Sequence, residues 1–301
     1  MSSRRGLVVT SVALVVECVG GMGCHATPSE KPSERDASAR VVPAAPMNVT
    51  PLPAASVAAY VNPSHLPPYT GPTGSVEGTV RVDGPPSPEM KGVDVSTCPG
   101  AARMYAKLFR EGPPQTDGSR ALADAVVAVT GYSGFYVPET NESASLHIVN
   151  CAFDTRTIAM TFGQRLDVQN DDADLWAPSL AQSPAPVLMM ATSHGDPVRM
   201  YPPHPGYFTI IDKEKHPWAQ ADAYVLLHPL HDVTNVVGHY RIDGVPVGKM
   251  KVSARLRVLQ HEATAETEVL ENVVKTVDLL IHYTPTAERI GDGGAPPKVI
   301  P

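Results

Sequence analysis

The sequence predicts an all-β protein, and three observations lead to that prediction. Beyond residue 73 the chain contains many short runs rich in Val, Ile and Leu, separated by Gly and Pro turns. Helical periodicity is almost absent. The composition is Pro-rich and charge-poor, with 31 prolines and 18% charged residues, and it supplies enough aliphatic residues for β cores. Short strands joined by such turns predict β-sandwiches.

The N-terminus reads as a targeting segment. A pair of arginines and an apolar run, Leu7–Val16, precede Gly21-Met22-Gly23-Cys24, which is similar to a bacterial lipobox. We therefore expect residues 1–23 to be a signal peptide and Cys24 to carry lipid. Plain secretion after signal cleavage is the alternative. Because His25 and not Asp follows the cysteine, the expected address is the outer membrane, facing the periplasm or the cell surface.

The next segment, residues 24–73, is rich in Pro, Ala and Ser and predicts a disordered tether. Residues 285–301 predict a polar tail. No other run approaches the roughly 18 apolar residues of a membrane span, so the lipid is the expected membrane anchor. The formal net charge is −7 and the basic residues are scattered, which argues against a nucleic-acid partner.

The folded part is expected to consist mainly of strands. One short helical piece is expected within Ser96–Gly112, and Lys249–Val258 is expected to pair with the strand before it across a Gly/Pro turn. The expected strands are Gly74–Gly84, Ala123–Tyr132, Ser145–Asn150, Thr157–Phe162, Gln164–Gln169, Tyr207–Ile211, Tyr224–Leu227, His239–Asp243, Lys249–Val258 and Val273–Tyr283.

Two cysteines remain after the signal and the lipidated position are set aside. Cys98 and Cys151 form an even pair in an oxidising compartment, so a structural disulfide is expected between them. In the chain-entropy model, closing a loop of roughly 50 residues contributes about 4 kcal/mol. Two free thiols, or a metal-binding pair, are the alternatives.

Three motifs in the middle of the chain resemble one family. They are Asn150-Cys151-Ala152-Phe153, the run GQRLDVQNDDADLW from Gly163, and the run HPWAQADAYVLLHP from His216. In this order they resemble the cupredoxin, or plastocyanin-like, domains of bacterial secreted proteins. The resemblance implies a Greek-key β-sandwich over residues 74–231. It also implies a copper centre at the His-Pro-Trp corner.

A second resemblance follows directly. The run DVTNVVGHYRIDGVPVGKMKVSARL is similar to carboxypeptidase-regulatory-like modules, which are small transthyretin-like β-sandwiches. It implies a second domain over residues 232–284. Modules of this kind are not themselves catalytic.

The copper ligands of the cupredoxin family can be placed on this chain one by one. The first His falls at Trp176, the Cys at Lys213 and the axial Met at Ala219, so only His216 is retained. A blue-copper centre needs two His, a thiolate and a weak axial ligand. Indole offers a metal no lone pair, and a Lys ammonium repels it. We therefore expect no metal here, with His216 as a vestigial ligand.

Other candidate sites are weaker. Soft Met and His side chains suit Cu(I), so a copper site around His216 is kept as an alternative, although core Met and loop His residues give the same pattern. His228 and His231 are expected to face opposite ways in an extended chain. Lys213-Glu214-Lys215 reads as a solvated loop tip. The copper candidates are Met189, Met190, His194, Met200, His204 and His216; Asp171, Asp172 and Asp174 form an acidic turn without the spacing of an EF-hand.

These observations favour a non-enzymatic cell-envelope lipoprotein that binds or scaffolds an unknown envelope protein on a degenerate cupredoxin frame. No cofactor is expected, and hydrolase motifs such as Gly-x-Ser-x-Gly are absent from the sequence. Copper handling through a Met/His site is the alternative function. A role as accessory subunit of a redox complex rests on fold analogy alone.

Overall fold

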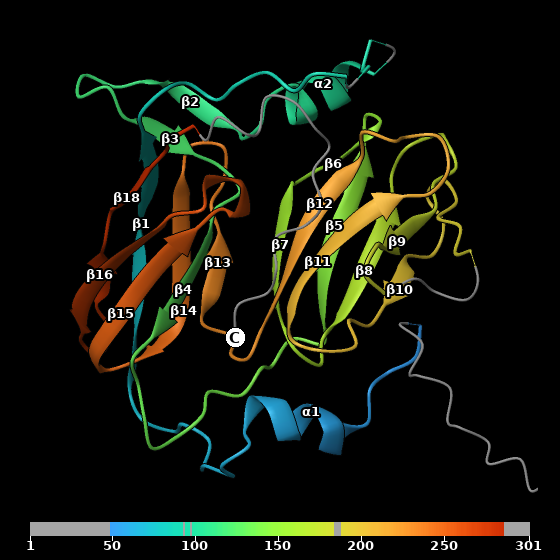
Figure 1. Cartoon of the computed structure of the whole chain (residues 1–301). Helices are drawn as coiled ribbons and strands as arrows, with labels where there is room; N and C mark the ends of the chain where they lie inside the picture. The colour runs from blue at the N-terminus through green and yellow to red at the C-terminus, as the bar shows by residue number, and fades with distance from the viewer. Residues whose placement is uncertain (1–48, 93, 97, 184–187, 286–301) are drawn as a thin grey trace, which may run out of the picture. The chain divides into compact units, whose positions relative to one another are not determined.

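The computed structural model describes residues 49–92, 94–96, 98–183 and 188–285. In this part the chain is mainly strand (Figure 1), so the all-β fold class is confirmed. The expected signal peptide, Cys24, the first half of the expected tether and nearly all of the expected tail lie outside the described residues. None of the described helices has the length and apolar character needed to cross a bilayer.

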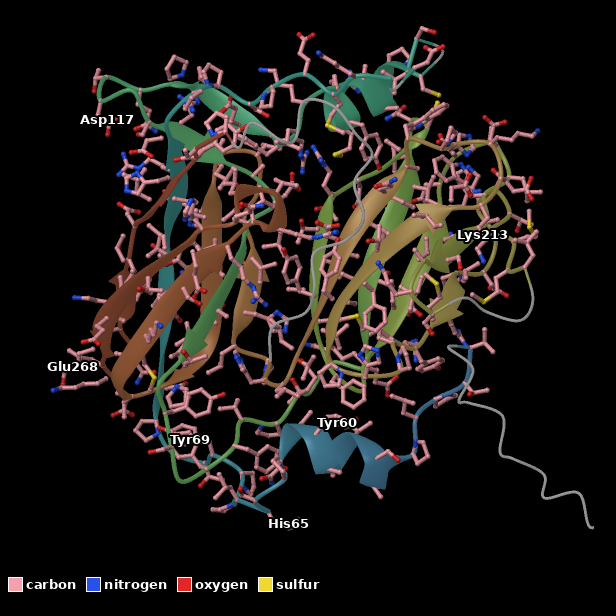
Figure 2. All side chains as sticks on the ribbon, in the orientation of Figure 1. Tyr60, His65, Tyr69, Asp117, Lys213 and Glu268 are labelled. Carbon is pink, nitrogen blue, oxygen red and sulfur yellow. The ribbon has the colours of Figure 1, made fainter. Side chains whose placement is uncertain are left out.

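One β-sandwich, called here the terminal sandwich, is built from both ends of the described chain. Its strands are β1 (Thr73–Asp83), β2 (Glu111–Pro114), β3 (Arg120–Leu122), β4 (Val126–Thr130), β13 (His231–Val233), β14 (His239–Pro246), β15 (Gly248–Arg255), β16 (Glu262–Val269), β17 (Val274–Thr276) and β18 (Leu279–His282). One sheet has the order β14-β1-β3-β2, with β17 and β18 also paired to β1, and the other has the order β13-β4-β15-β16. Glu268 projects from the outer strand β16 (Figure 2).

The second β-sandwich, called here the inserted sandwich, comes from the middle of the chain. Its strands are β5 (Ser143–Val149), β6 (Ala152–Phe153), β7 (Thr157–Thr161), β8 (Arg165–Asn170), β9 (Pro178–Leu180), β10 (Val198–Met200), β11 (Gly206–Asp212) and β12 (Gln220–Leu226). One sheet has the order β10-β8-β5-β6 and the other β7-β12-β11-β9. Each sandwich has its own apolar core.

The inserted sandwich interrupts a β-hairpin of the terminal sandwich. Strands β4 and β13 pair antiparallel, with Ala128 opposite His231, and the Val129 N–H donates to the Leu230 carbonyl at 2.9 Å. The chain leaves the end of β4, forms the inserted sandwich and returns to the start of β13. The predicted division into 74–231 and 232–284 is therefore wrong, because β1 and β4 pair with the C-terminal strands.

Strand β1 shows why the early strands belong with the late ones. Its burial alternates strictly along the strand, and Val76, Val80 and Val82 are fully buried in the core of the terminal sandwich. Val76 lies opposite Ile242 in β14, and Val80 lies opposite Leu279 in β18. Every second residue of a strand faces the same side, so this alternation places one face of β1 in a core that it shares with C-terminal strands.

The expected pairing of His239–Asp243 with Lys249–Val258 is also wrong. Strand β14 pairs with β1, while β15 pairs with β16 and β4 in the other sheet. The Pro246-Val247-Gly248 step carries the chain across from one sheet to the other, and Gly248 has a φ of +124°. A tight hairpin and a sheet-to-sheet corner use the same turn residues, and only the pairing partners distinguish them.

The expected disorder of residues 24–73 does not hold for its second half. Helix α1 (Ala54–Val61) forms there, and Leu52, Val57 and Val61 pack against the core of the inserted sandwich. The Tyr60 ring, labelled in Figure 2, packs edge-on against Phe162 at 5.1 Å between centroids. These apolar residues supply a partly buried face that the Pro/Ala/Ser composition conceals.

Candidate functional site

The candidate site is the corner that follows β11, and a buried carboxylate holds it together. Asp212 is the last residue of β11 and His216 lies four residues later, both buried. The Asp212 carboxylate accepts hydrogen bonds from the His216 N–H at 3.1 Å and from the Lys215 N–H at 3.2 Å. It also contacts His216 Nδ1 at 2.9 Å, and its other oxygen accepts from the Ala177 N–H at 2.6 Å. The Asp-x-x-x-His spacing is the sequence signal for this carboxylate, and sequence reasoning missed it.

An aromatic stack fills the centre of this corner. Trp176 is fully buried and its indole lies parallel to the His216 imidazole, with ring centroids 3.7 Å apart and planes 9° apart. Trp218 also packs against the His216 ring in a T-shaped contact, with centroids 5.5 Å apart. A backbone bridge to Ala191 holds Trp176 in place, with hydrogen bonds of 3.2 and 2.8 Å. His216 thus contacts two indoles.

All four positions that align with copper ligands meet at this corner. Trp176 and His216 stack, the Ala219 N–H donates to the His216 carbonyl at 2.9 Å, and the Lys213 N–H donates to the Ala177 carbonyl at 3.0 Å. Ala219 is buried, whereas Lys213 lies at the surface past the end of β11 (Figure 2). The structure therefore brings together the positions that the sequence singled out, with non-ligand side chains on three of them.

The residues present do not fit a type 1 copper centre. The space beside the His216 ring is occupied by the Trp176 indole, and His216 Nδ1 already contacts Asp212. Indole, ammonium and methyl side chains offer a soft metal no lone pair at neutral pH. Across the described residues, no group of three or more His, Cys, Asp and Glu side chains is arranged to hold a metal ion.

The other Met and His candidates lie in different surroundings. Met200 is fully buried in the core of the inserted sandwich, and Met189 packs against that core from its rim. His194 and His204 are exposed, and His204 packs against Phe208 with centroids 4.9 Å apart. The thioethers thus act as core packing, and the two imidazoles lie on loops beside it. Met190, the remaining candidate, is half-buried.

Side chains of the acidic turn after β8 bind neighbouring groups of the fold. Asp172 accepts hydrogen bonds from the Asn150 and Cys151 N–H groups at 3.0 and 2.5 Å. Asp171 pairs with the His147 ring at 2.7 Å. Asp172 is therefore occupied in positioning the β5–β6 turn.

The two cysteines are close together but not bonded. Cys98 lies at the start of helix α2 (Pro99–Tyr105), Cys151 lies in the β5–β6 turn, and both are free thiols. The predicted disulfide is therefore absent from this structure. Burial, together with a hydrogen bond to the Cys98 thiol, raises the pKa of Cys151 to about 12. The structure thus shows the second of the three sequence-based alternatives, a pair of free thiols in contact.

His228 and His231 lie where the chain returns to the terminal sandwich. Thr161 Oγ1 lies 3.3 Å from His231 Nε2 and donates to Glu139 at 2.6 Å. Burial, reinforced by the nearby His228, lowers the pKa of His231 to about 4. His228 Nδ1 is buried and has no hydrogen-bond partner in the described structure. Both residues are therefore half-buried and close enough to interact, which the expectation that they face opposite ways did not predict.

Comparisons with known proteins identify structural similarity only. No protein-family model matches the chain, and no curated protein is similar to it. Solved structures of amicyanin are similar: that from Paracoccus versutus is 13% identical with a TM-score of 0.26, and 33% of this chain covers 97% of that chain. A methionine-to-alanine amicyanin mutant in the Cu(I) form gives 13% identity and a TM-score of 0.25 over the same shares. A reduced tryptophan-to-tyrosine mutant gives 12% and 0.26, again over the same shares.

Proposed function

We propose that this chain is a non-enzymatic cell-envelope lipoprotein that binds or scaffolds a partner protein. In this proposal the inserted sandwich is a cupredoxin-like frame whose copper centre has been replaced by an aromatic stack. The parallel stack of Trp176 on His216 carries the proposal. A fully buried indole contributes packing energy to the core, and it occupies space that a metal and its ligands would need.

The surroundings of the stack support a structural role for the corner. Asp212 satisfies buried backbone donors there, and the Trp218 Nε1–H donates to the Cys151 carbonyl at 3.0 Å. A carboxylate used in this way stabilises the loop conformation. The corner therefore has the features of a rigid element on which a partner can assemble.

A copper titration tests the loss of the redox centre. The soluble chain from Ala26 onward is mixed with Cu(II) and, under reductant, with Cu(I), and visible absorption and bound metal are recorded. We expect no intense thiolate-to-copper band and no tight stoichiometric binding. An intense visible band would overturn the proposal. Tight Cu(I) binding that is lost in His216→Ala would replace it with copper handling through a Met/His site.

Membrane anchoring is tested separately in cells. We expect the wild-type chain in the outer-membrane fraction and Cys24→Ala in the soluble periplasmic fraction, because the acyl chains supply the binding energy for the membrane. Unchanged membrane association of Cys24→Ala would refute the lipid anchor. Cys98→Ala is the matched control, since it removes a cysteine from the folded part and leaves the lipobox intact.

A further inference from the structure

Helix α2 and the β5–β6 turn approach each other at backbone distance. The helix belongs to the connection between β1 and β2 of the terminal sandwich, whereas the turn belongs to the inserted sandwich. A Cβ atom added to Gly100 would lie 2.0 Å from the Asn150 carbonyl oxygen. Only glycine permits this approach, so the first turn of α2 is fixed against the β5–β6 turn.

The β5–β6 turn is itself held in an uncommon backbone conformation. Asn150 and Cys151 have φ values of +54° and +58°, which residues other than Gly, Asn and Asp seldom adopt. Two consecutive positive φ angles are typical of a tight type I′ hairpin turn. The Asp172 carboxylate holds both backbone N–H groups of the turn. The β5–β6 turn therefore holds Cys151 rigidly beside α2.

The two thiols meet in an apolar cluster between these elements. Cys98 is 6% exposed and packs with Ala101, Met104 and Tyr105 of α2, and Cys151 packs against the same cluster. Cys98 begins the helix, since its carbonyl accepts from the Ala102 N–H at 3.1 Å. A bond between the sulfurs would therefore join the start of α2 to the turn across their existing contact.

We propose that Cys98 and Cys151 form a reversible disulfide that latches α2 onto the inserted sandwich. The oxidant is a disulfide compound, which accepts two electrons and is released as two thiols. One cysteine thiolate attacks it to form a mixed disulfide, and the second cysteine thiolate then displaces the remaining thiol. The two cysteine protons are transferred to the two departing thiolates, and reduction by a thiol runs through the same steps in reverse.

The latch would act on a cavity beneath α2. This cavity has a volume of about 660 Å³ and is lined by both elements, including Gly100, Met104, Asn150 and Phe153. In the reduced state α2 is held by packing and by two hydrogen bonds, from the Phe153 N–H to the Tyr105 hydroxyl at 3.3 Å and from the Arg156 guanidinium to the Met104 carbonyl at 3.4 Å. Oxidation adds a covalent link, so the reduced state is the one in which α2 can open the cavity.

The His216 corner of the candidate site is connected to the two thiols through Trp218. Trp218 packs against the thiol cluster, and its Nε1–H holds the Cys151 carbonyl. Its ring also contacts His216 edge-on. Movement of the turn on oxidation would therefore reach the His216 corner through one side chain. The inference goes beyond the proposed scaffolding role and does not depend on it.

The test follows the thiols and the helix in one preparation. The reduced chain from Ala26 onward, whose two cysteines are Cys98 and Cys151, is equilibrated in glutathione buffers of increasing oxidised fraction, trapped with an alkylating reagent and weighed by mass spectrometry. We expect both free thiols to disappear together as an intramolecular disulfide and to return with excess reduced glutathione. Failure to form this bond would overturn the inference, and so would a bond that reduced glutathione cannot open in the native protein.

Hydrogen exchange separates a latch from an incidental disulfide. We expect the amides of Ala102 and Ala106, in and just after α2, to exchange at least about tenfold more slowly after oxidation, because the cross-link suppresses local opening. Exchange rates that are unchanged between the two states would overturn the latch. Cys98→Ser and Cys151→Ser are the matched controls, and in each the oxidised buffer should leave α2 exchange unaltered.

Discussion

Removing the Asp212 carboxylate tests whether this group holds the corner together. Asp212→Ala takes the acceptor away from two buried N–H groups, those of Ala177 and His216, which water cannot reach. Each buried donor left without an acceptor costs about 1–3 kcal/mol, so we expect a loss of about 4 kcal/mol in the free energy of unfolding. Lys215 is exposed and its amide can bind water instead. Asp212→Asn keeps one carbonyl oxygen and should lose about half as much.

Denaturant-induced unfolding, followed by tryptophan fluorescence, measures this loss in the free energy of unfolding of the inserted sandwich. Both tryptophans of the chain, Trp176 and Trp218, lie beside the corner, so their emission reports the inserted sandwich. Asp196→Ala removes an exposed carboxylate from the same sandwich and should change stability by less than about 0.5 kcal/mol. If Asp212→Ala lies within about 1 kcal/mol of the wild type, this carboxylate does not hold the corner and the reasoning fails.

Three further predictions follow from the same structure. The folded pKa of His231, about 4, lies below its usual 6.5, so the free energy of unfolding should fall by about 3 kcal/mol as pH drops from 6.5 to 4. His231→Gln should show a shallower decline when unfolding is measured across this pH range. An unchanged slope would refute this prediction. Gly100→Ala should destabilise by about 1–3 kcal/mol in thermal unfolding, because its Cβ overlaps the Asn150 carbonyl, whereas a wild-type melting temperature would mean that α2 shifts freely. Replacing residues 131–228 by a two-residue turn should leave a terminal sandwich that unfolds cooperatively by circular dichroism; loss of that transition would show that its core needs the insertion.

Local pattern was enough to find the corner and most of the longer strands, although it missed β16 and several short strands. Val76, Val80 and Val82 alternate along one expected strand, and alternation of this kind depends only on neighbouring residues. The His-Pro-Trp step fixed the corner, and the distances along the chain then placed Lys213 and Ala219 beside it. These inferences succeed because they need no knowledge of which strands pair.

The insertion could not be seen in the sequence, because it depends on partners far apart in the chain. The apolar face of β1 is compatible with any sheet that offers a complementary face, and its real partner β14 begins more than 150 residues later. The stack of Trp176 on His216 could not be predicted from the sequence for a related reason. A tryptophan in a ligand position signals the loss of a ligand, while its parallel packing on the remaining histidine depends on the backbone bridge to Ala191.

The insertion also gives the thiol pair its significance. A domain inserted in a hairpin is joined to its host by two chain crossings, here after β4 and before β13, which lie side by side in one sheet. These two crossings are covalent, whereas other contacts between the sandwiches, such as the hydrogen bonds from Arg156 to the Lys107 and Leu108 carbonyls, are not. Cys98 comes from the host's β1–β2 connection and Cys151 from the insertion, so their disulfide would be a third covalent link. A change in the oxidation of two sulfur atoms would then change the number of covalent connections between the two sandwiches from two to three.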